Sequence, residues 1–434
     1  MLPRPKSSSP KSSSPTDFFR SSPSQPSSTS SRKPPSSRPC SPSRASSSKP
    51  RSGPGEAQKA AASVPQKGTR AIVMDMGTWS CKAGLAGDAE PSSRVGSVVG
   101  YPLKKKQKSS EVGKEAFVGK LARAQPDLDL VEPVSRGIVV DWEAAEELWR
   151  HVFYRELKVS PSDRGVLLTD PPTSPTTNRE KIAEVLFETF DCPGIYVAYQ
   201  SVLAVYSYGL TSGLVVDCGA GATRTVPVSD GYNLPHAIER VDLAGEDLTQ
   251  HLSRLLQASG SSCEKGRHVV EDIKHKCCYV ASDFPRECKL SADECGVDYE
   301  LPDGSVVSLG QERFRCPEAL FRPSMLGSHL KGVPAMALHS LSRVKSAESR
   351  AGLYGSILLS GGSTMFPGFQ ERFHKELLAL GPEHQPRILS DPKRKHAVWV
   401  GGSILASLAA FQSLWVKKTD YQEVGPYIIH RRCY

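Results

Sequence analysis

The stretch AIVMDMGTWSCKAGLAGD, residues 71–88, starts as an apolar strand and turns at an aspartate followed closely by a glycine. Hydroxyl side chains, Lys82 and further glycines follow the turn. Backbone N–H groups presented by such a turn form a concave site for phosphate oxygens. Trp79 stands where a phosphate loop usually has a residue without a side chain. The stretch therefore predicts a phosphate-binding hairpin with an unusually large side chain at its tip.

The same pattern returns in LVVDCGAGATRTV, residues 214–226. Each copy consists of an apolar strand, an aspartate, a glycine turn and a polar return strand, so Asp75 and Asp217 hold equivalent places. Two such hairpins can close on a triphosphate from opposite sides, with their backbone amides facing the phosphates. Because carboxylates cannot face phosphate directly, we expect Asp75 and Asp217 to hold the waters of a divalent cation.

A third turn, LLSGGSTMFPGF at 358–369, places Gly361 and Gly362 where a flat base or a ribose can approach the backbone. Glycine also occurs in many turns that bind nothing. Each turn alone is therefore equally compatible with a purely structural role, and it is the pair of hairpins that predicts a nucleotide site.

From residue 71 onward, apolar strands alternate with amphipathic helices. Buried strands that end in polar or glycine turns are predicted at 71–75, 165–170, 194–199 and 213–219. The spacing of apolar residues predicts helices over 142–157 and 178–190. This alternation indicates an α/β fold.

The first 69 residues differ from the rest of the chain in composition. They contain 22 serines and 13 prolines, and twelve Lys and Arg against two acidic residues, whereas the rest of the chain is nearly neutral. Their few apolar side chains cannot offset the entropy of ordering the chain, so 1–69 is predicted to be a disordered basic tail. The tail is either a solvated extension or a tether to nucleic acid, anionic membrane or an acidic protein, tuned by phosphorylation at Ser-Pro pairs.

Neither a structural metal site nor a signal peptide or membrane span is expected. The eleven cysteines and eleven histidines show no spacing typical of a metal site, so no structural metal is predicted. The sequence shows neither an apolar signal-peptide core nor a run of about eighteen apolar residues. We therefore expect neither secretion nor a membrane span, and reduced thiols in the cytoplasm or nucleus.

Residues 70–434 resemble actin along their whole length. The motifs that carry this resemblance are CKAGLAGD (81–88), TNREKIAEVLFETF (177–190), the segment 301–327, LLSGGSTMFPGF (358–369), VWVGGSILASLAAFQSLWV (398–416) and IIHRRCY (428–434). Segments 199–217 and 272–284 are more similar to the divergent testis-type actin-like proteins of the sperm head. The resemblance implies the two-lobed, four-subdomain fold of the actin, hexokinase and heat-shock ATPase superfamily, with small subdomains at 98–132 and 245–329.

The resemblance also implies a role for individual residues around ATP or ADP with Mg²⁺ in a central cleft. The residues that match those around the cation and the attacking water are Asp75, Gln200 and Asp217. The residues that match the phosphate and nucleoside contacts are Gly77, Thr78, Lys82, Gly219, Gly221, Gly245, Lys274, Gly361, Gly362, Met365 and Lys395.

Several positions depart from the actin pattern. Ala220 stands where actin has an aspartate, and Arg224 stands where actin has a histidine that helps to place the attacking water. A guanidinium carries no acceptor, so Arg224 cannot take a proton. The other departures are Met76, Trp79, Glu271 and His275. We expect weakened nucleotide binding and no effective hydrolysis, so the chain is not expected to be an efficient enzyme.

Self-assembly is also expected to be poor. Leu103–Ala116 matches the flexible inter-subunit loop of actin, whose apolar tip docks into the next subunit. This chain has four lysines between 104 and 108, and burying them in such a groove is unfavourable. The alternative is a variant filament that keeps these lysines in solvent.

Three functions follow from these expectations. The first is a structural interaction protein of the spermatid head, at the acrosome and perinuclear layer, with cytoskeletal or sperm-head proteins as partners. Its body would be a monomer or a subunit of a hetero-complex, in the cytoplasm and cytoskeleton. The second is a filament-forming slow ATPase like conventional actin. The third is a nuclear actin-related subunit of a chromatin complex, in which the basic tail contacts DNA.

Overall fold

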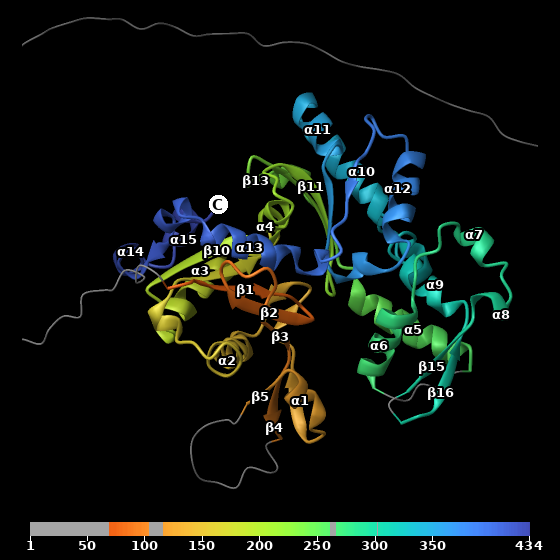
Figure 1. The fold of residues 1–434 in the computed structure, drawn as a ribbon, viewed down its shortest axis with the longest axis horizontal. Coiled ribbons are helices and arrows are strands. Elements are labelled where there is room, and N and C mark those ends of the chain that lie inside the picture. Colours follow the sequence, from red (N-terminus) through yellow and green to blue (C-terminus); the bar gives the residue numbers. More distant parts are fainter. Residues whose placement is uncertain (1–68, 104–115, 261–265, 302) are drawn as a thin grey trace, which may run out of the picture. The chain divides into compact units, whose positions relative to one another are not determined.

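The computed structural model describes residues 69–103, 116–260, 266–301 and 303–434. The predicted tail at 1–69 and the predicted inter-subunit loop at 103–116 lie almost entirely outside the described residues. Strands and helices alternate through the described part (Figure 1), so the α/β fold predicted from the sequence is confirmed. None of the helices described combines the length and apolar character that crossing a membrane requires.

The first large sheet is built around a hairpin and a parallel strand. β1 (Ile72–Met76) pairs antiparallel with β2 (Ser80–Leu85) and parallel with β9 (Val166–Asp170). The remaining strands of this sheet are β3 (Ser93–Gly96), β10 (Gly194–Tyr199) and β19 (Val416–Lys417). All five residues of β1 are buried, which explains its continuous apolar pattern on both sides of Asp75.

The second large sheet repeats this arrangement. β11 (Gly213–Cys218) pairs antiparallel with β12 (Thr223–Ser229) and parallel with β17 (Ile357–Ser360). The remaining strands are β13 (Tyr232–Asn233), β14 (Glu239–Val241) and β18 (Ile388–Leu389). The duplication seen in the sequence is therefore a duplication of structure, with one glycine turn at the end of each hairpin.

Helices surround the two sheets. Those near the first sheet are α2 (Trp142–His151), α3 (Thr176–Glu184), α14 (Lys418–Val424) and α15 (Ile428–Arg432). Those near the second sheet are α10 (Val333–Ser342), α11 (Ala347–Tyr354) and α12 (Phe369–Ala379). The predicted helices at 142–157 and 178–190 are confirmed, although each ends in a π-helical turn, at Val152–Glu156 and Val185–Thr189.

Two helices that connect the two large sheets along the chain pack on each other. α4 (Gln200–Ser207) starts directly after β10, and α13 (Ala397–Ser407) lies against it. A Cβ atom at Gly401 would lie 1.8 Å from the carbonyl oxygen of Leu203, so only glycine allows this approach. Trp399 is fully buried and its indole N–H donates to the Val73 carbonyl at 3.0 Å. These contacts tie α13 to the strand that carries the first hairpin.

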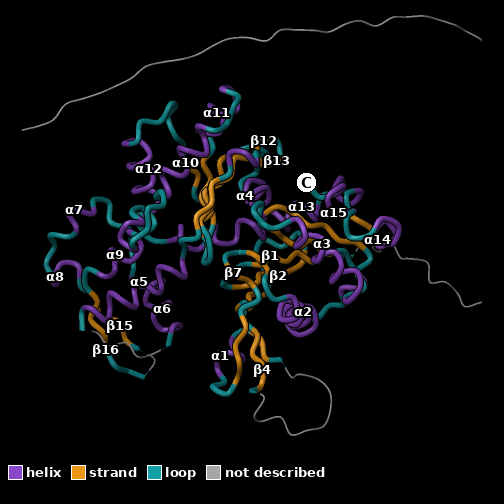
Figure 2. The backbone as a smooth tube through the Cα atoms, turned by 180° about the vertical axis from the view of Figure 1, so that it is seen from behind, coloured by secondary structure: helices purple, strands orange, loops and turns teal. Residues whose placement is uncertain are grey.

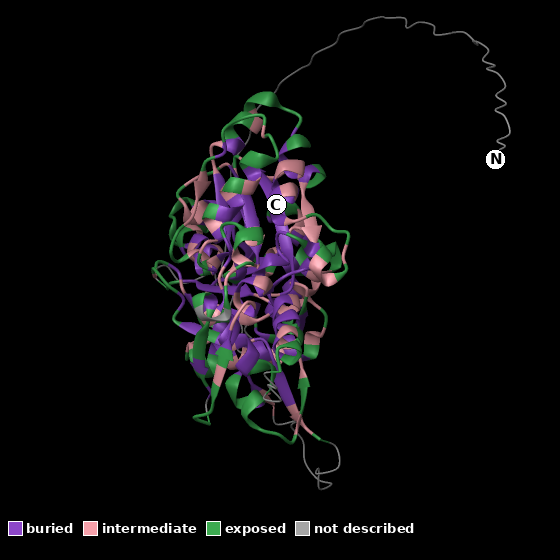
Figure 3. Ribbon diagram, turned by 90° about the vertical axis from the view of Figure 1, so that its right-hand side faces the viewer, coloured by how far each residue is buried: buried purple, intermediate pink, exposed green. Residues whose placement is uncertain are grey.

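Two smaller groups of elements extend from the large sheets (Figure 2). The first group consists of β4 (Val99–Pro102), β5 (Phe117–Val118), α1 (Lys120–Ala124) and β6 (Leu128–Val131). The second consists of α5 (Gly245–Ala258), α6 (Arg267–Cys277), α7 (Phe284–Glu287), α8 (Ala292–Cys295), β15 (Val297–Glu300), β16 (Val306–Leu309) and α9 (Glu312–Glu318). They fall within the predicted small subdomains at 98–132 and 245–329, whose boundaries stay predictions. Buried residues concentrate on the strands of the large sheets (Figure 3).

Candidate functional site

A cavity of about 500 Å³ lies between the turns of the two hairpins, which is within the size range of small-molecule sites. The fourteen residues matched to cation and nucleotide contacts and the departing residues Ala220 and Arg224 all line it. They are Asp75, Gly77, Thr78, Lys82, Gln200, Asp217, Gly219, Ala220, Gly221, Arg224, Gly245, Lys274, Gly361, Gly362, Met365 and Lys395. The structure therefore brings the predicted site together, and the binding role of each residue stays a prediction.

The first hairpin holds Asp75 in a closed set of hydrogen bonds. Asp75 and Lys82 are cross-strand partners, and the Lys82 ammonium lies 2.7 Å from Asp75 Oδ2. Asp75 Oδ1 accepts from the Thr169 hydroxyl at 2.8 Å and from the Gln200 amide at 3.3 Å. Burial alone would lower the pKa of Lys82, but the Asp75 carboxylate outweighs it and raises that pKa. Lys82 is therefore a fixed positive charge at the edge of the cavity.

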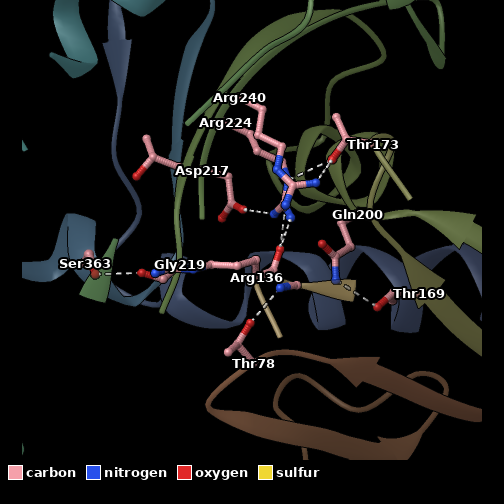
Figure 4. Close-up of polar contacts among 12 residues, drawn as sticks. Thr78, Arg136, Thr169, Thr173, Gln200, Asp217, Gly219, Arg224, Arg240 and Ser363 are labelled. Atoms are coloured by element: carbon pink, nitrogen blue, oxygen red, sulfur yellow. Dashed lines mark hydrogen bonds and ion pairs between the residues drawn. The ribbon is translucent and has the colours of Figure 1, made fainter. Parts of the chain in front are cut away.

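The second hairpin places Arg224 beside Asp217 in the same cross-strand position (Figure 4). The guanidinium Nη1 lies 3.8 Å from Asp217 Oδ2, and the Arg224 side chain is only 6% exposed. Its Nη2 donates to the Arg136 carbonyl at 3.0 Å and its Nε donates to the Thr173 hydroxyl at 3.3 Å. Burial raises the pKa of Asp217, and Arg224 opposes that rise. Arg224 thus donates on several sides and offers no acceptor to a water molecule.

The turn between β7 (Val134–Ser135) and β8 (Ile138–Val139) joins the two hairpins, and it was not predicted from the sequence. The Gly137 N–H donates to the Thr78 hydroxyl at 2.8 Å, on the first hairpin. The Arg136 guanidinium donates to the Gly221 carbonyl at 3.2 Å, on the second hairpin, and to both carboxylate oxygens of Asp247 at 2.5 and 2.9 Å. Its only signal in the sequence is an Arg-Gly pair between two very short apolar segments.

The second and third glycine turns also contact each other. The Gly219 carbonyl accepts from the Ser363 hydroxyl at 2.8 Å (Figure 4). It also accepts from the Gly245 N–H, at the start of α5, at 3.1 Å. Gly361 has a φ of +87°, and a Cβ atom there would lie 2.3 Å from the Cys218 carbonyl oxygen. A side chain at Gly361 would therefore strain the backbone and push the third turn away from the second hairpin.

Trp79 does not fill the phosphate turn. Its ring lies under the Arg123 guanidinium of α1, 4.4 Å from ring centroid to Cζ. Its carbonyl accepts from the Ser97 N–H at 3.0 Å, and the Gly77 N–H closes the turn on the Ser80 carbonyl at 3.2 Å. The hairpin shape predicted for this loop is confirmed, and Trp79 is one of the residues that line the cavity.

Three ionisable residues of α6, Glu271, Lys274 and His275, also line the cavity. Lys274 is buried and donates to the Gly245 carbonyl at 2.8 Å and to the Thr249 hydroxyl at 2.7 Å. Glu271 lies 3.4 Å from the Lys274 ammonium, and burial raises the pKa of Glu271. Burial and the neighbouring Lys274 lower the pKa of His275 to about 4. Glu271 and His275, the two departures from the actin pattern here, therefore stand beside a lysine that is already engaged.

His396 is a lining residue that the sequence did not single out. It is 5% exposed, and neither ring nitrogen has a hydrogen-bond partner among the described residues. Burial, together with Arg94, Lys82 and Lys395, lowers its pKa to about 4. A neutral imidazole with both nitrogens free can donate and accept toward a ligand in the cavity.

Comparison with known proteins agrees with this geometry. The actin family model matches residues 66–434. Actin-like protein 9 of Bos taurus is 51% identical over 369 residues, covering 84% of this chain and 88% of the relative. Actin-like protein 9 of Homo sapiens is 50% identical over 377 residues, covering 86% and 90%. Actin-like protein 7A of Mus musculus is 46% identical over 368 residues, covering 84% and 83%. The similarity to actin-like proteins expected from the sequence is confirmed, and the chain belongs to the actin family.

Proposed function

We propose that this actin-family chain is a structural interaction protein that binds a nucleotide in its cleft and hydrolyses it poorly or not at all. It would act in the organisation of the spermatid head, at the acrosome and perinuclear layer, with cytoskeletal or sperm-head proteins as partners. The observation that carries the proposal is the fixed position of Arg224 against Asp217.

A nucleotide fits the residues that are present. The cavity has the volume for one, and glycines from three turns leave backbone exposed along it. A Cβ atom at Gly362 would meet nothing within 4 Å, so this turn has open space beside it. Backbone N–H groups and the Lys82 ammonium would meet the phosphates, and His396 would be available to the nucleoside.

Hydrolysis requires a group that orients a water molecule and accepts its proton. Arg224 has no acceptor, and both oxygens of Asp75 already accept hydrogen bonds. The Gln200 amide nitrogen is held by Asp75 and by the Met76 carbonyl, each at 3.3 Å. Loss of one positioned catalytic group costs about 10²–10³ in rate. We therefore expect bound nucleotide to be a structural ligand.

A gain-of-function variant tests this assignment. The double substitution Ala220→Asp with Arg224→His restores the residues that actin has at these positions. We expect it to release phosphate from ATP measurably faster than the natural chain, in a coupled phosphate assay. A matched control is Arg240→His, which alters a neighbouring arginine that does not line the cavity. Equal rates for the double variant and the natural chain would contradict the role given to Arg224.

Weak self-assembly is the second part of the proposal. It rests on the lysines between 104 and 108, which lie outside the described residues. Sedimentation of the purified full chain with Mg-ATP should leave it in the supernatant, and co-sedimentation with F-actin together with pull-down from testis extract should recover partners. Filaments that elongate from the chain alone would contradict this part.

The competing function is a filament-forming slow ATPase. It is favoured by one observation, since Asp75, Gln200 and Asp217 meet in one cavity as they would in conventional actin. Phosphate release that accompanies filament growth would support it over an interaction protein.

A further inference from the structure

We propose that the cleft binds a nucleoside triphosphate without a divalent cation, because Lys82 and Arg224 supply at fixed positions the positive charge that a metal ion would bring. The inference rests on the proposed function, since it concerns the same ligand in the same cavity. It starts from the symmetry of the hairpins. Asp75 faces Lys82 across β1 and β2, and Asp217 faces Arg224 across β11 and β12. Both hairpin aspartates at the cavity therefore have a basic cross-strand partner.

The donor set does not fit Mg²⁺. Magnesium demands octahedral oxygen geometry and is usually held by one or two carboxylates together with substrate phosphates. Both oxygens of Asp75 are engaged, one by Lys82 and the other by Thr169 and Gln200. The Asp217 carboxylate has the Arg224 guanidinium 3.8 Å away. A divalent ion placed between the two carboxylates would sit beside two fixed cations, and like charges at such distances repel strongly in a partly buried site.

Arg224 is held from several sides. Besides its bonds to the Arg136 carbonyl and the Thr173 hydroxyl, it packs against the backbone of the β7–β8 turn. A Cβ atom at Gly137 would lie 2.4 Å from Arg224 Nη2, so the glycine backbone rests directly on the guanidinium. A charge that is already ordered adds no ordering cost when the ligand binds. Arg224 can therefore act as a permanent substitute for a metal charge.

The remaining charges of the cavity also favour a metal-free anion. Five basic side chains line it against three carboxylates: Lys82, Arg94, Arg224, Lys274 and Lys395 against Asp75, Asp217 and Glu271. Arg94 on β3 is the cross-strand partner of Lys82 on β2, so the two cations lie side by side across the sheet. This excess of positive charge matches a triphosphate whose charge is not already neutralised by a metal ion.

The direct test is ATP affinity of the full chain with and without free divalent cation. Binding is measured by calorimetry in excess MgCl₂ and again in excess EDTA, and by the shift of the thermal transition under both conditions. We expect dissociation constants that agree within about threefold, a small difference on the scale of binding free energies. Inorganic tripolyphosphate should compete with ATP in EDTA, because the phosphates alone meet Lys82 and Arg224.

A charge variant and a matched control locate the effect. Arg224→Gln removes the charge beside Asp217, and we expect ATP binding in EDTA to weaken about tenfold while binding in MgCl₂ weakens less. Arg240→Gln is the control, because Arg240 also donates to the Arg136 carbonyl and to Thr173 but does not line the cavity. We expect this control to keep the affinity of the natural chain in both buffers.

The outcomes separate this inference from the function on which it rests. ATP binding that is at least tenfold weaker in EDTA than in MgCl₂ would overturn the inference alone and leave nucleotide binding in place. No binding in either buffer by the folded chain would overturn both. Equal affinities in the two buffers, together with the loss in Arg224→Gln, would support it.

Discussion

Acidification from pH 7 to pH 5 should destabilise the fold through His396. This imidazole is 5% exposed, lacks partners on both ring nitrogens among the described residues and lies among Arg94, Lys82 and Lys395. Burial, assisted by those cations, lowers its pKa from 6.5 to about 4, although Asp75 opposes the shift. In the unfolded chain the ordinary pKa of about 6.5 returns. Between these two values the unfolded state binds more protons, so stability falls as the pH falls.

The size of this effect follows from the two pKa values. Moving from pH 7 to pH 5 protonates His396 almost completely in the unfolded chain and only slightly in the folded chain. Linkage then predicts a loss of about 2 kcal/mol in the free energy of unfolding from this one residue. At pH 7 His396 is mostly neutral in both states, so little stability is lost. The free energy of unfolding then falls progressively as the pH drops from about 6.5 toward about 4.

Urea unfolding of the natural chain and of His396→Gln at both pH values measures this loss. Glutamine does not titrate, and the other histidines, including His275, are common to both proteins. The natural chain should therefore lose about 2 kcal/mol more than His396→Gln on acidification. A difference below about 0.5 kcal/mol would refute the reasoning, because it would mean that His396 is protonated as easily in the folded state as in the unfolded chain.

Three further predictions concern the core and the cleft. Arg372→Met removes one of the two guanidinium groups beside the fully buried Glu318 and leaves that of Arg322 at 3.1 Å, so urea unfolding should show a loss of about 2–3 kcal/mol in the free energy of unfolding. Gly401→Ala places a Cβ atom 1.8 Å from a carbonyl oxygen of α4 and should lower the free energy of unfolding by about 3 kcal/mol or more. In Gly362→Ala the new Cβ atom meets nothing within 4 Å, so the free energy of unfolding should change by less than about 1 kcal/mol. Thermal unfolding measures both. ATP should change the fluorescence of Trp79, which is stacked under a guanidinium and lines the cavity, and the change should be absent in Trp79→Phe.

The strands and hairpins of this molecule could be predicted from the sequence because they depend on local patterns. An apolar run, an aspartate and a glycine turn fix a strand and its reversal, so both hairpins and their equivalent aspartates were found. The resemblance to actin then assigned fourteen residues to one site, and all of them line one cavity.

The side-chain arrangement in the site could not be predicted, because it depends on contacts between segments that are distant in the sequence. Nothing in the sequence near Arg224 indicates that its guanidinium meets a carbonyl 88 residues earlier, at Arg136. The direction of Trp79 depends on Arg123, which belongs to a five-residue helix with no pattern of its own. His396 was missed because a single histidine at the end of a short basic turn, Arg394–His396, shows no spacing typical of a ligand site.

Cross-strand pairing explains why replacing one residue of the family pattern changes the whole site. Residue 224 faces Asp217 directly, so an arginine there neutralises the carboxylate and contacts the β7–β8 turn at the same time. The same substitution thus removes an acceptor for water and adds a fixed cation. The weak hydrolysis and the metal-independent binding that we propose would therefore have one structural cause.

Phosphate release from the full chain with ATP bound tests the central claim most directly. ATP is added at a concentration at which calorimetry shows the site to be occupied, and phosphate is followed with a coupled assay. The account predicts release at the buffer baseline while ATP stays bound, with or without Mg²⁺. Steady phosphate release from the occupied site would contradict it, because Arg224 would then not prevent the water from being oriented and deprotonated.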